Sequence, residues 1–90
     1  MITLNPLKID GASIAVTNPF VDHRGLFGRF FCKQELREAL GEREIVNINF
    51  SMTKMRGSIR GLHFQYPPEA EMKFVRCLRG AVFDVIVDLR

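Results

Sequence analysis

Cysteine and the larger aromatic residues are scarce in this 90-residue sequence, which has two cysteines, one tyrosine and no tryptophan. Cys32 and Cys77 do not form a C-x-x-C pair, so a disulfide-rich secreted scaffold is excluded and we expect two reduced core thiols. No apolar run exceeds three residues, which excludes a transmembrane helix and the apolar core of a signal peptide. We therefore expect a cytoplasmic protein without a membrane partner.

The lack of tyrosine and tryptophan also limits what the positive charge can bind. Residues 51–80 contain six Lys or Arg and two Glu, a local charge of +4 in a chain whose formal net charge is +3. A focused basic region indicates an anionic partner. Single-stranded nucleic acids are bound by interleaved basic and aromatic residues, and no recognition-helix or zinc-finger pattern is present. The composition therefore favours a small phosphorylated ligand and predicts no nucleic-acid partner.

Length and composition predict one globular domain over residues 1–90. Hydrophobic residues make up 47% and charged residues 26% of the chain, as in ordinary globular domains. One helix is predicted over residues 33–40, where apolar residues recur three and four positions apart and Gly41 provides a stop. Before this helix the sequence predicts extended segments at 13–16 and 26–31, a break at Asn18-Pro19 and a turn at 22–25.

Beyond the helix the sequence alternates between apolar and polar residues, which is typical of strands. Four strands are predicted there, at residues 43–51, 58–65, 72–78 and 81–90. Closely spaced strands with one short helix predict a mainly β fold, as a sandwich, jelly roll or barrel. These strands are too few to close such a fold, so we expect another copy or further chain to cover the open edges.

His63 is the strongest candidate for catalysis, because an imidazole that titrates near neutral pH is the usual general base. Arg60 precedes it by three residues and Lys73 lies on the next predicted strand. A hydrogen-bonded structural role for His63 is an equally open interpretation. In a regular strand His63 and Arg60 point to opposite faces, so a shared pocket requires a bend, for which Gly61 is the position.

Three other polar residues are candidates for binding. Asn47 and Asn49 are two apart and share a strand face, as either a solvated surface or an amide wall that hydrogen-bonds a ligand. Arg24 follows the predicted turn and is either solvated or ligand-binding. No metal site is expected: the spacing from Gly57 to His63 fits the opening of a metal-binding cupin motif, but Gln65 stands where that motif has a second His.

Taken in order, these segments resemble the dTDP-4-dehydrorhamnose 3,5-epimerase family over residues 18–90. The matching pieces are DHRGLF, NINFS, RGLHFQ, the Pro-Pro pair, KFVRC and GAVFDVIVDLR. The resemblance implies a metal-free, cupin-like jelly roll (a double-stranded β-helix), here incomplete and with one short N-terminal helix. It also implies a cytoplasmic homodimer that uses no cofactor and acts on a dTDP-sugar.

The same resemblance implies epimerisation at C3 and C5 of a dTDP-4-keto-6-deoxyhexose, in nucleotide-sugar synthesis of the dTDP-rhamnose type. It makes His63 the base that removes the proton next to the ketone and Lys73 the group that stabilises the enolate oxygen. Six residues take substrate-binding roles: Arg24 and Arg60 at the diphosphate and sugar, Phe27 on the thymine, and Asn47, Asn49 and Arg29 in the nucleotide site.

Departures from the family pattern keep alternatives open. Asn47 stands where the family commonly has Gln, and Arg29 stands where many members have a Glu that contacts the nucleotide. The Tyr acid and the Asp that orients the histidine belong to a C-terminal half that these 90 residues do not contain, so we expect weak or absent catalysis by this chain alone. The alternatives are a non-catalytic or truncated sugar-nucleotide-binding module, a 3-epimerase and a 3,4-ketoisomerase.

Overall fold

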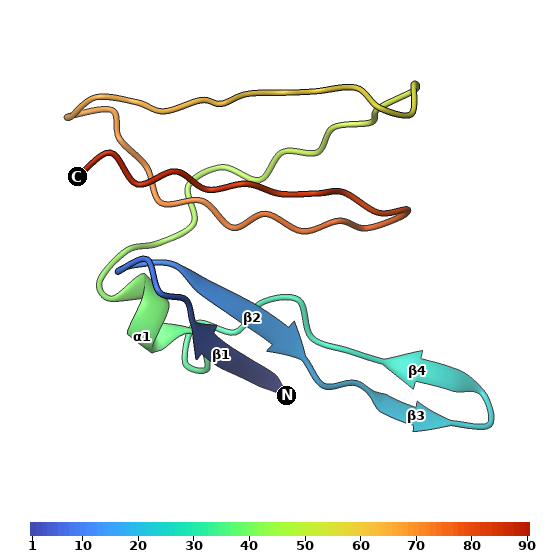
Figure 1. Ribbon diagram of the computed structural model, residues 1–90. Coiled ribbons are helices and arrows are strands. Elements are labelled where there is room, and N and C mark those ends of the chain that lie inside the picture. The colour runs from blue at the N-terminus through green and yellow to red at the C-terminus, as the bar shows by residue number, and fades with distance from the viewer. The chain divides into compact units, whose positions relative to one another are not determined.

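All regular secondary structure lies in the first half of the chain (Figure 1). The computed structural model describes residues 1–90, and the chain forms two units, residues 1–48 and 49–90. The elements of the first unit are β1 (Ile2–Pro6), β2 (Ser13–Thr17), β3 (Phe20–Asp22), β4 (Gly25–Phe27) and α1 (Arg37–Leu40). They make two separate antiparallel pairs, β1–β2 and β3–β4.

The β1–β2 hairpin confirms the predicted extended segment at 13–16. Ile2 lies opposite Thr17 and Pro6 opposite Ser13. Gly11, with a φ of +86°, helps to reverse the chain between the two strands. The predicted break is also confirmed, because β2 ends before Asn18, whose side-chain amide donates to the Thr3 hydroxyl at 3.0 Å.

The β3–β4 hairpin confirms the predicted turn at 22–25. Asp22 lies opposite Gly25, so only two residues form the turn, and the φ of +138° at Gly25 is one that a side chain would disfavour. The strand predicted over 26–31 is wrong in its second half, since β4 ends at Phe27. β3 starts at Phe20, opposite Phe27, and offers no partner to the residues beyond.

The predicted helix forms, but it is shorter than the 33–40 expected. Turns occupy residues 33–36, and α1 covers only Arg37–Leu40. Gly41 ends it as predicted, with a φ of +58° and its N–H donated to the Arg37 carbonyl at 2.8 Å. The apolar stripe is confirmed, because Leu36 and Leu40 are the buried hydrophobic residues of the chain, with 1% and 3% of their surface exposed.

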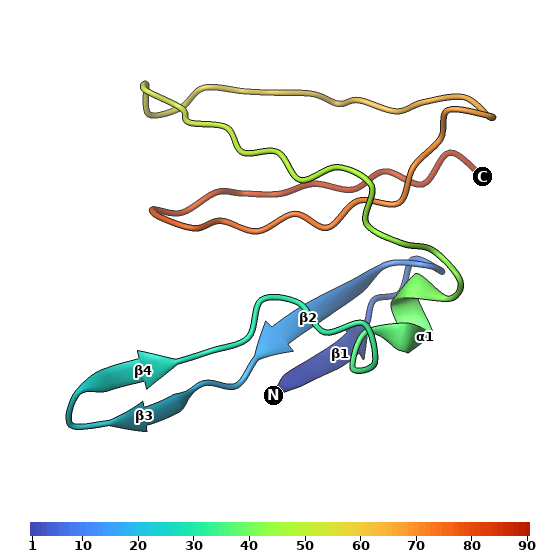
Figure 2. The same ribbon diagram turned by 180° about the vertical axis from the view of Figure 1, so that it is seen from behind.

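The chain beyond α1 contains turns but none of the predicted strands. The turns at Met55–Ser58 and Tyr66–Glu69 close with backbone hydrogen bonds of 3.3 and 3.0 Å. The prediction of strands at 43–51, 58–65, 72–78 and 81–90 is wrong, because no hydrogen-bonded ladder forms there. Figures 1 and 2 show long extended runs instead. Alternation favours an extended backbone, but a strand also needs a neighbour whose N–H and C=O groups meet its own.

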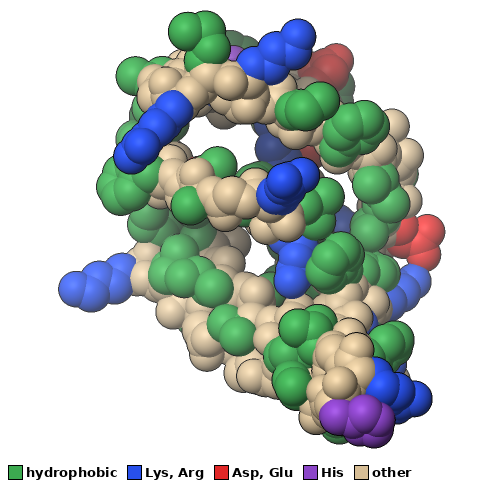
Figure 3. Space-filling view, turned by 90° about the vertical axis from the view of Figure 1, so that its right-hand side faces the viewer, with side chains coloured by type: hydrophobic (Ala, Val, Ile, Leu, Met, Phe, Trp, Pro, Cys, Tyr) green, Lys and Arg blue, Asp and Glu red, His purple; other side chains and the backbone are tan.

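The apolar side chains of these extended runs remain on the surface. Phe50, Ile59 and Phe83 are 88%, 92% and 95% exposed, and Figure 3 shows hydrophobic side chains spread between projecting Lys and Arg. Cys77 is exposed and Cys32 half-buried, both as free thiols, so the expectation of two core thiols is wrong for Cys77. The chain has no helix that is long and apolar enough to span a membrane.

At this level the structure confirms a mainly β fold with one short helix. Its two pairs of strands fall short of the two larger sheets of a jelly roll. The jelly roll therefore stays a prediction.

Candidate functional site

Two of the predicted substrate-binding residues lie together on the β3–β4 hairpin. Arg24 and Phe27 line an open hollow of about 370 Å³, with Phe20, Asp22, Gly25 and Leu26 as the other lining residues. Phe27 lies directly opposite Phe20 in the strand register, and both rings are about two-thirds exposed, at 67% and 69%. A cation beside two aromatic rings can bind an anion attached to a flat ring.

Asp22 holds Arg24 within the hairpin turn. Its Oδ2 accepts hydrogen bonds from Nη2 of Arg24 at 2.6 Å and from Nε at 3.2 Å. Its Oδ1 accepts the backbone N–H of Arg24 at 2.8 Å. The hydrogen bond from the Arg24 side chain, followed by the backbone bonds, lowers the pKa of Asp22 below its ordinary value. The carboxylate is therefore charged at neutral pH, and the guanidinium has a fixed partner.

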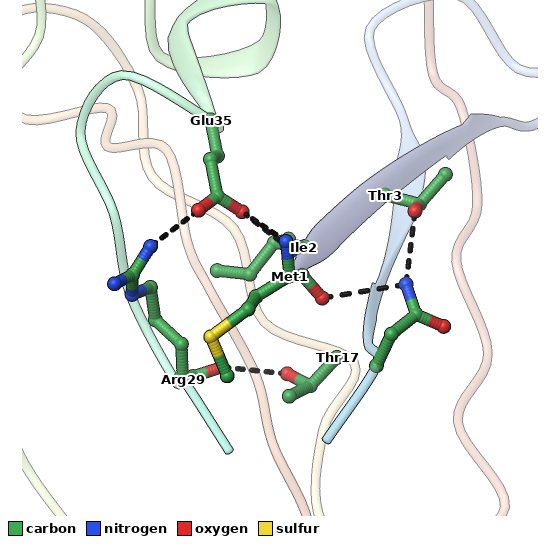
Figure 4. A network of polar contacts seen from close by, with 7 residues as sticks. Met1, Ile2, Thr3, Thr17, Arg29 and Glu35 are labelled. Atoms are coloured by element: carbon green, nitrogen blue, oxygen red, sulfur yellow. Dashed lines mark hydrogen bonds and ion pairs between the residues drawn. The ribbon is translucent and has the colours of Figure 1, made fainter. Parts of the chain in front are cut away.

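Arg29 lies in a different polar network, which joins the hairpins to the turn before α1 (Figure 4). Its Nη1 donates to Oε1 of Glu35 at 2.5 Å, and its backbone carbonyl accepts the Thr17 hydroxyl at 2.7 Å. Oε2 of Glu35 accepts the backbone N–H of Ile2 at 2.5 Å and lies 3.2 Å from the ammonium group of Met1. The structure thus ties Arg29 to β1 and β2 through Glu35 and Thr17.

Glu35 is an important residue that the sequence did not single out. The hydrogen bond from Ile2, then those from Arg29 and the N-terminus, lowers its pKa from 4.5 to about 2, against the opposing effect of desolvation. Glu35 follows Arg29 by six residues and Ile2 by 33, and neither spacing is a rule of helix or strand pairing. Only the fold brings these groups together.

The two asparagines fall at the division between the units. Asn47 belongs to the first unit and Asn49 to the second, and both are exposed. They lie on extended backbone without ladder partners. Each amide therefore has donors and acceptors that are open to water or to a ligand.

His63, Arg60 and Lys73 all belong to the second unit, where they are exposed. Gly61, the position of the predicted bend, has a φ of +103°, which favours glycine, but the structure has no turn or bend there. The His63 imidazole lies close to it, since a Cβ added at Gly61 would be 3.7 Å from Nδ1 of His63. Nη2 of Arg60 donates to the Met52 carbonyl at 3.3 Å. An exposed imidazole and an exposed ammonium can exchange protons with water, but an enolate is stabilised best where water is excluded.

His, Cys, Asp and Glu side chains do not gather anywhere in groups of three or more that could hold a metal ion. The candidate residues therefore form two groups, one in each unit: an aromatic and cationic hairpin in the first unit, and an imidazole with cations in the second.

The chain matches the family model described as dTDP-4-dehydrorhamnose 3,5-epimerase over residues 6–90. It is 41% identical to a dTDP-4-dehydrorhamnose 3,5-epimerase of Streptomyces griseus, over 97% of this chain and 44% of the relative. A protein of the same name from Sinorhizobium fredii is 45% identical, over 93% of this chain and 43% of the relative. A dTDP-4-dehydrorhamnose 3-epimerase of Streptomyces niveus is 40% identical, over 97% and 42%.

The chain thus spans less than half the length of these three relatives. No solved structure is significantly similar to it.

Proposed function

The chain belongs to the dTDP-4-dehydrorhamnose 3,5-epimerase family, a family of isomerases, and from this membership we propose that it serves the epimerisation of a dTDP-4-keto-6-deoxyhexose at C3 and C5. The observation that carries the proposal is the match over residues 6–90, which includes every candidate site residue. In a cell this reaction belongs to nucleotide-sugar synthesis of the dTDP-rhamnose type.

The proposed chemistry uses a base and an oxyanion partner. His63 removes the proton from the carbon next to the C4 ketone, and the charge passes to the C4 oxygen as an enolate. Lys73 stabilises that oxygen with its ammonium group, because such a carbon acid loses its proton readily only when the enolate charge is balanced. Return of a proton to the opposite face inverts the centre. The proposal requires neither a metal nor a cofactor.

The proposed substrate contacts divide between the nucleotide and its phosphates. Arg24 and Arg60 bind the diphosphate and sugar, and Phe27 packs on the thymine. The hollow that Arg24 and Phe27 share supports this assignment. Asn47, Asn49 and Arg29 complete the nucleotide site in the proposal, although Arg29 reaches a ligand only with the guanidinium atoms that Glu35 leaves free.

We place both units in one jelly-roll domain, in a cytoplasmic homodimer. The support is the exposed apolar surface, because extended segments without partners need other strands to cover their edges. The relatives, of which the chain spans less than half, carry further sequence that could supply such strands.

Epimerisation at C3 alone is the second candidate. It is favoured by the similarity to a relative named 3-epimerase, at 40% identity, and by Arg29 at a position where the resemblance led us to expect Glu. A third candidate, a non-catalytic dTDP-sugar-binding module, is favoured by the exposure of His63 and Lys73.

Two measurements test the proposal. Calorimetric titration with dTDP at low salt should show binding that weakens as salt is raised, because the contacts are between charges. Incubation with a dTDP-4-keto-6-deoxyhexose in D₂O should then incorporate deuterium at C3 and C5, at a low rate because the family's Tyr acid and the Asp that orients the histidine are not among these 90 residues. Deuterium at C3 alone selects the second candidate, and dTDP binding without exchange selects the third. A chain that binds no nucleoside diphosphate at low salt contradicts the proposal.

A further inference from the structure

We propose that Asp22 is a positioning residue for Arg24, whose carboxylate fixes one edge of the guanidinium so that the other edge is presented to a diphosphate. The inference rests on the proposed function, in which Arg24 is a diphosphate ligand, and adds the residue that prepares it. It is carried by three hydrogen bonds within the hairpin turn, from Nη2, Nε and the backbone N of Arg24, at 2.6, 3.2 and 2.8 Å.

The geometry of the contact divides the guanidinium into two edges. A guanidinium carries five N–H donors in one plane. Asp22 takes the edge formed by Nε and Nη2. The remaining edge, formed by Nη1 and the second N–H of Nη2, is the pair of parallel donors that suits two phosphate oxygens. The Arg24 side chain is 79% exposed, so this edge is accessible to a ligand in solution.

The backbone makes the contact short and rigid. Asp22 and Gly25 are the last paired residues of β3 and β4, so Arg24 lies in a two-residue turn. Because Oδ1 of Asp22 also accepts the Arg24 N–H, one carboxylate closes the turn and orients the side chain. A free arginine loses rotamer freedom when it binds, and an arginine already held in place loses less. The pair therefore strengthens anion binding by preorganisation.

The chain contains a matched control for this pair. Asp88 and Arg90 repeat the D-x-R spacing, with Oδ1 of Asp88 accepting from N and Nε of Arg90 at 2.9 Å each and Oδ2 accepting from Nη2 at 3.0 Å. Asp88→Asn removes the same charge from the same kind of contact, but outside the Arg24 hollow.

The test is the affinity of the full chain for dTDP in Asp22→Asn and Asp88→Asn. Asparagine keeps an oxygen for the turn and removes one negative charge. If charge alone mattered, Asp22→Asn would bind the anion more tightly. Loss of positioning predicts the opposite sign, a weakening of about two- to tenfold, while Asp88→Asn binds no more weakly than wild type. In an Arg24→Gln background, Asp22→Asn should have no further effect, which a general structural role would not predict.

The outcomes separate the two proposals. If Arg24→Gln weakens dTDP binding but Asp22→Asn leaves it equal or tighter, the positioning role is overturned and the proposed function stands. If the wild type binds no dTDP, the proposed function is overturned together with the positioning role. If Arg24→Gln leaves dTDP binding unchanged, Arg24 is not a diphosphate ligand and Asp22 has no positioning role.

A second measurement needs neither a ligand nor the Asp22 variant. In nuclear magnetic resonance spectra, the Nε–H of Arg24, identified by its loss in Arg24→Gln, should exchange with water more slowly than the Nε–H of Arg56. Equal exchange rates at the two arginines would overturn the positioning role.

Discussion

Single polar side chains hold the first unit together, in which regular secondary structure is sparse. Glu35 joins the backbone of β1 to the side chain of Arg29, and Thr17 bonds to the Arg29 carbonyl from the end of β2. Only two hydrophobic residues of the chain, Leu36 and Leu40, are buried. Hydrogen bonds and ion pairs between segments distant in sequence therefore help to hold this unit together.

We predict that Glu35→Gln lowers the stability of the first unit and flattens its dependence on pH. The pKa of Glu35 is about 2 in the folded protein and 4.5 ordinarily, so the folded state binds the proton more weakly than the unfolded state does. The stabilisation is therefore present above about pH 4.5 and is lost as the pH falls toward about 2. Urea unfolding between about pH 6 and pH 2 measures it.

Glu38→Gln is the matched control, because Glu38 is an exposed glutamate three residues further along the chain, within α1. It should unfold with the pH dependence of the wild type. Equal pH dependence in Glu35→Gln and wild type would contradict the assigned pKa.

A second prediction concerns catalysis in the proposed reaction. His63→Asn should abolish deuterium exchange at the sugar carbon and leave the dissociation constant for dTDP within a few-fold of wild type. The base contributes on the order of 10²–10⁴ to the rate of proton transfer, whereas the arginines bind the diphosphate. Lys73→Met should also impair exchange with little effect on dTDP binding. Where the wild-type chain exchanges, exchange retained in His63→Asn would remove His63 from the base role.

Some of the candidate site could be predicted from residues alone. D-x-R-G-x-F places a two-residue turn between short strands, so Arg24 and Phe27 had to fall near each other, as observed. The shared pocket for Arg60 and His63 stays a prediction, since the hydrogen bond of the Arg60 side chain is to the Met52 carbonyl. The Glu35 network could not be predicted, because its members meet only after β1 and the segment before α1 are folded.

At the scale of elements, α1 owes its position to its apolar face. It has only four residues, too few to be stable as an isolated helix. Leu36 and Leu40 are one turn apart and buried. Their packing therefore supplies the stability that hydrogen bonds within so short a helix cannot. The glycine that follows stops the helix with a positive φ.

We therefore predict that Leu36→Ala or Leu40→Ala destabilises the first unit by about 2–5 kcal/mol. The physical reason is the loss of buried methyl groups together with the cavity left behind. Leu26→Ala is the control, since Leu26 is 73% exposed, and it should change stability by less than about 0.5 kcal/mol. Thermal or urea unfolding followed by circular dichroism measures all three, and equal effects at Leu36 and Leu26 would refute the burial argument.

The predicted strands that form are those whose partner strand is close in the sequence. β2 and the start of β4 were predicted, and each has a partner nearby in the sequence, but the partner strands β1 and β3 were not predicted. The apolar alternation around Phe50 and Phe83 was interpreted by the same rule, yet these residues have no ladder. Whether an extended segment becomes a strand depends on a neighbour, and alternation within one segment does not specify that neighbour.

At the scale of the whole molecule, we predict self-association into a homodimer. Large apolar side chains are exposed in each unit, among them Phe20, Val46 and Phe83 at 69%, 78% and 95%, and their burial between two copies would be favourable. Light scattering should give a mass near twice the 10.3 kDa of the chain. A folded monomer at micromolar concentration would count against this prediction.

The absence of strand ladders in residues 49–90 also makes this half of the molecule a good protease substrate. A protease active site aligns its substrate as an added strand, through the same N–H and C=O groups that a sheet would otherwise occupy. Here no strand ladder occupies those groups, and Lys54, Arg60 and Lys73 are exposed basic residues of this half. Trypsin should therefore cleave this half before it cuts at Arg37, which lies within α1. Any partner that supplies the missing strands would also protect this chain from proteolysis.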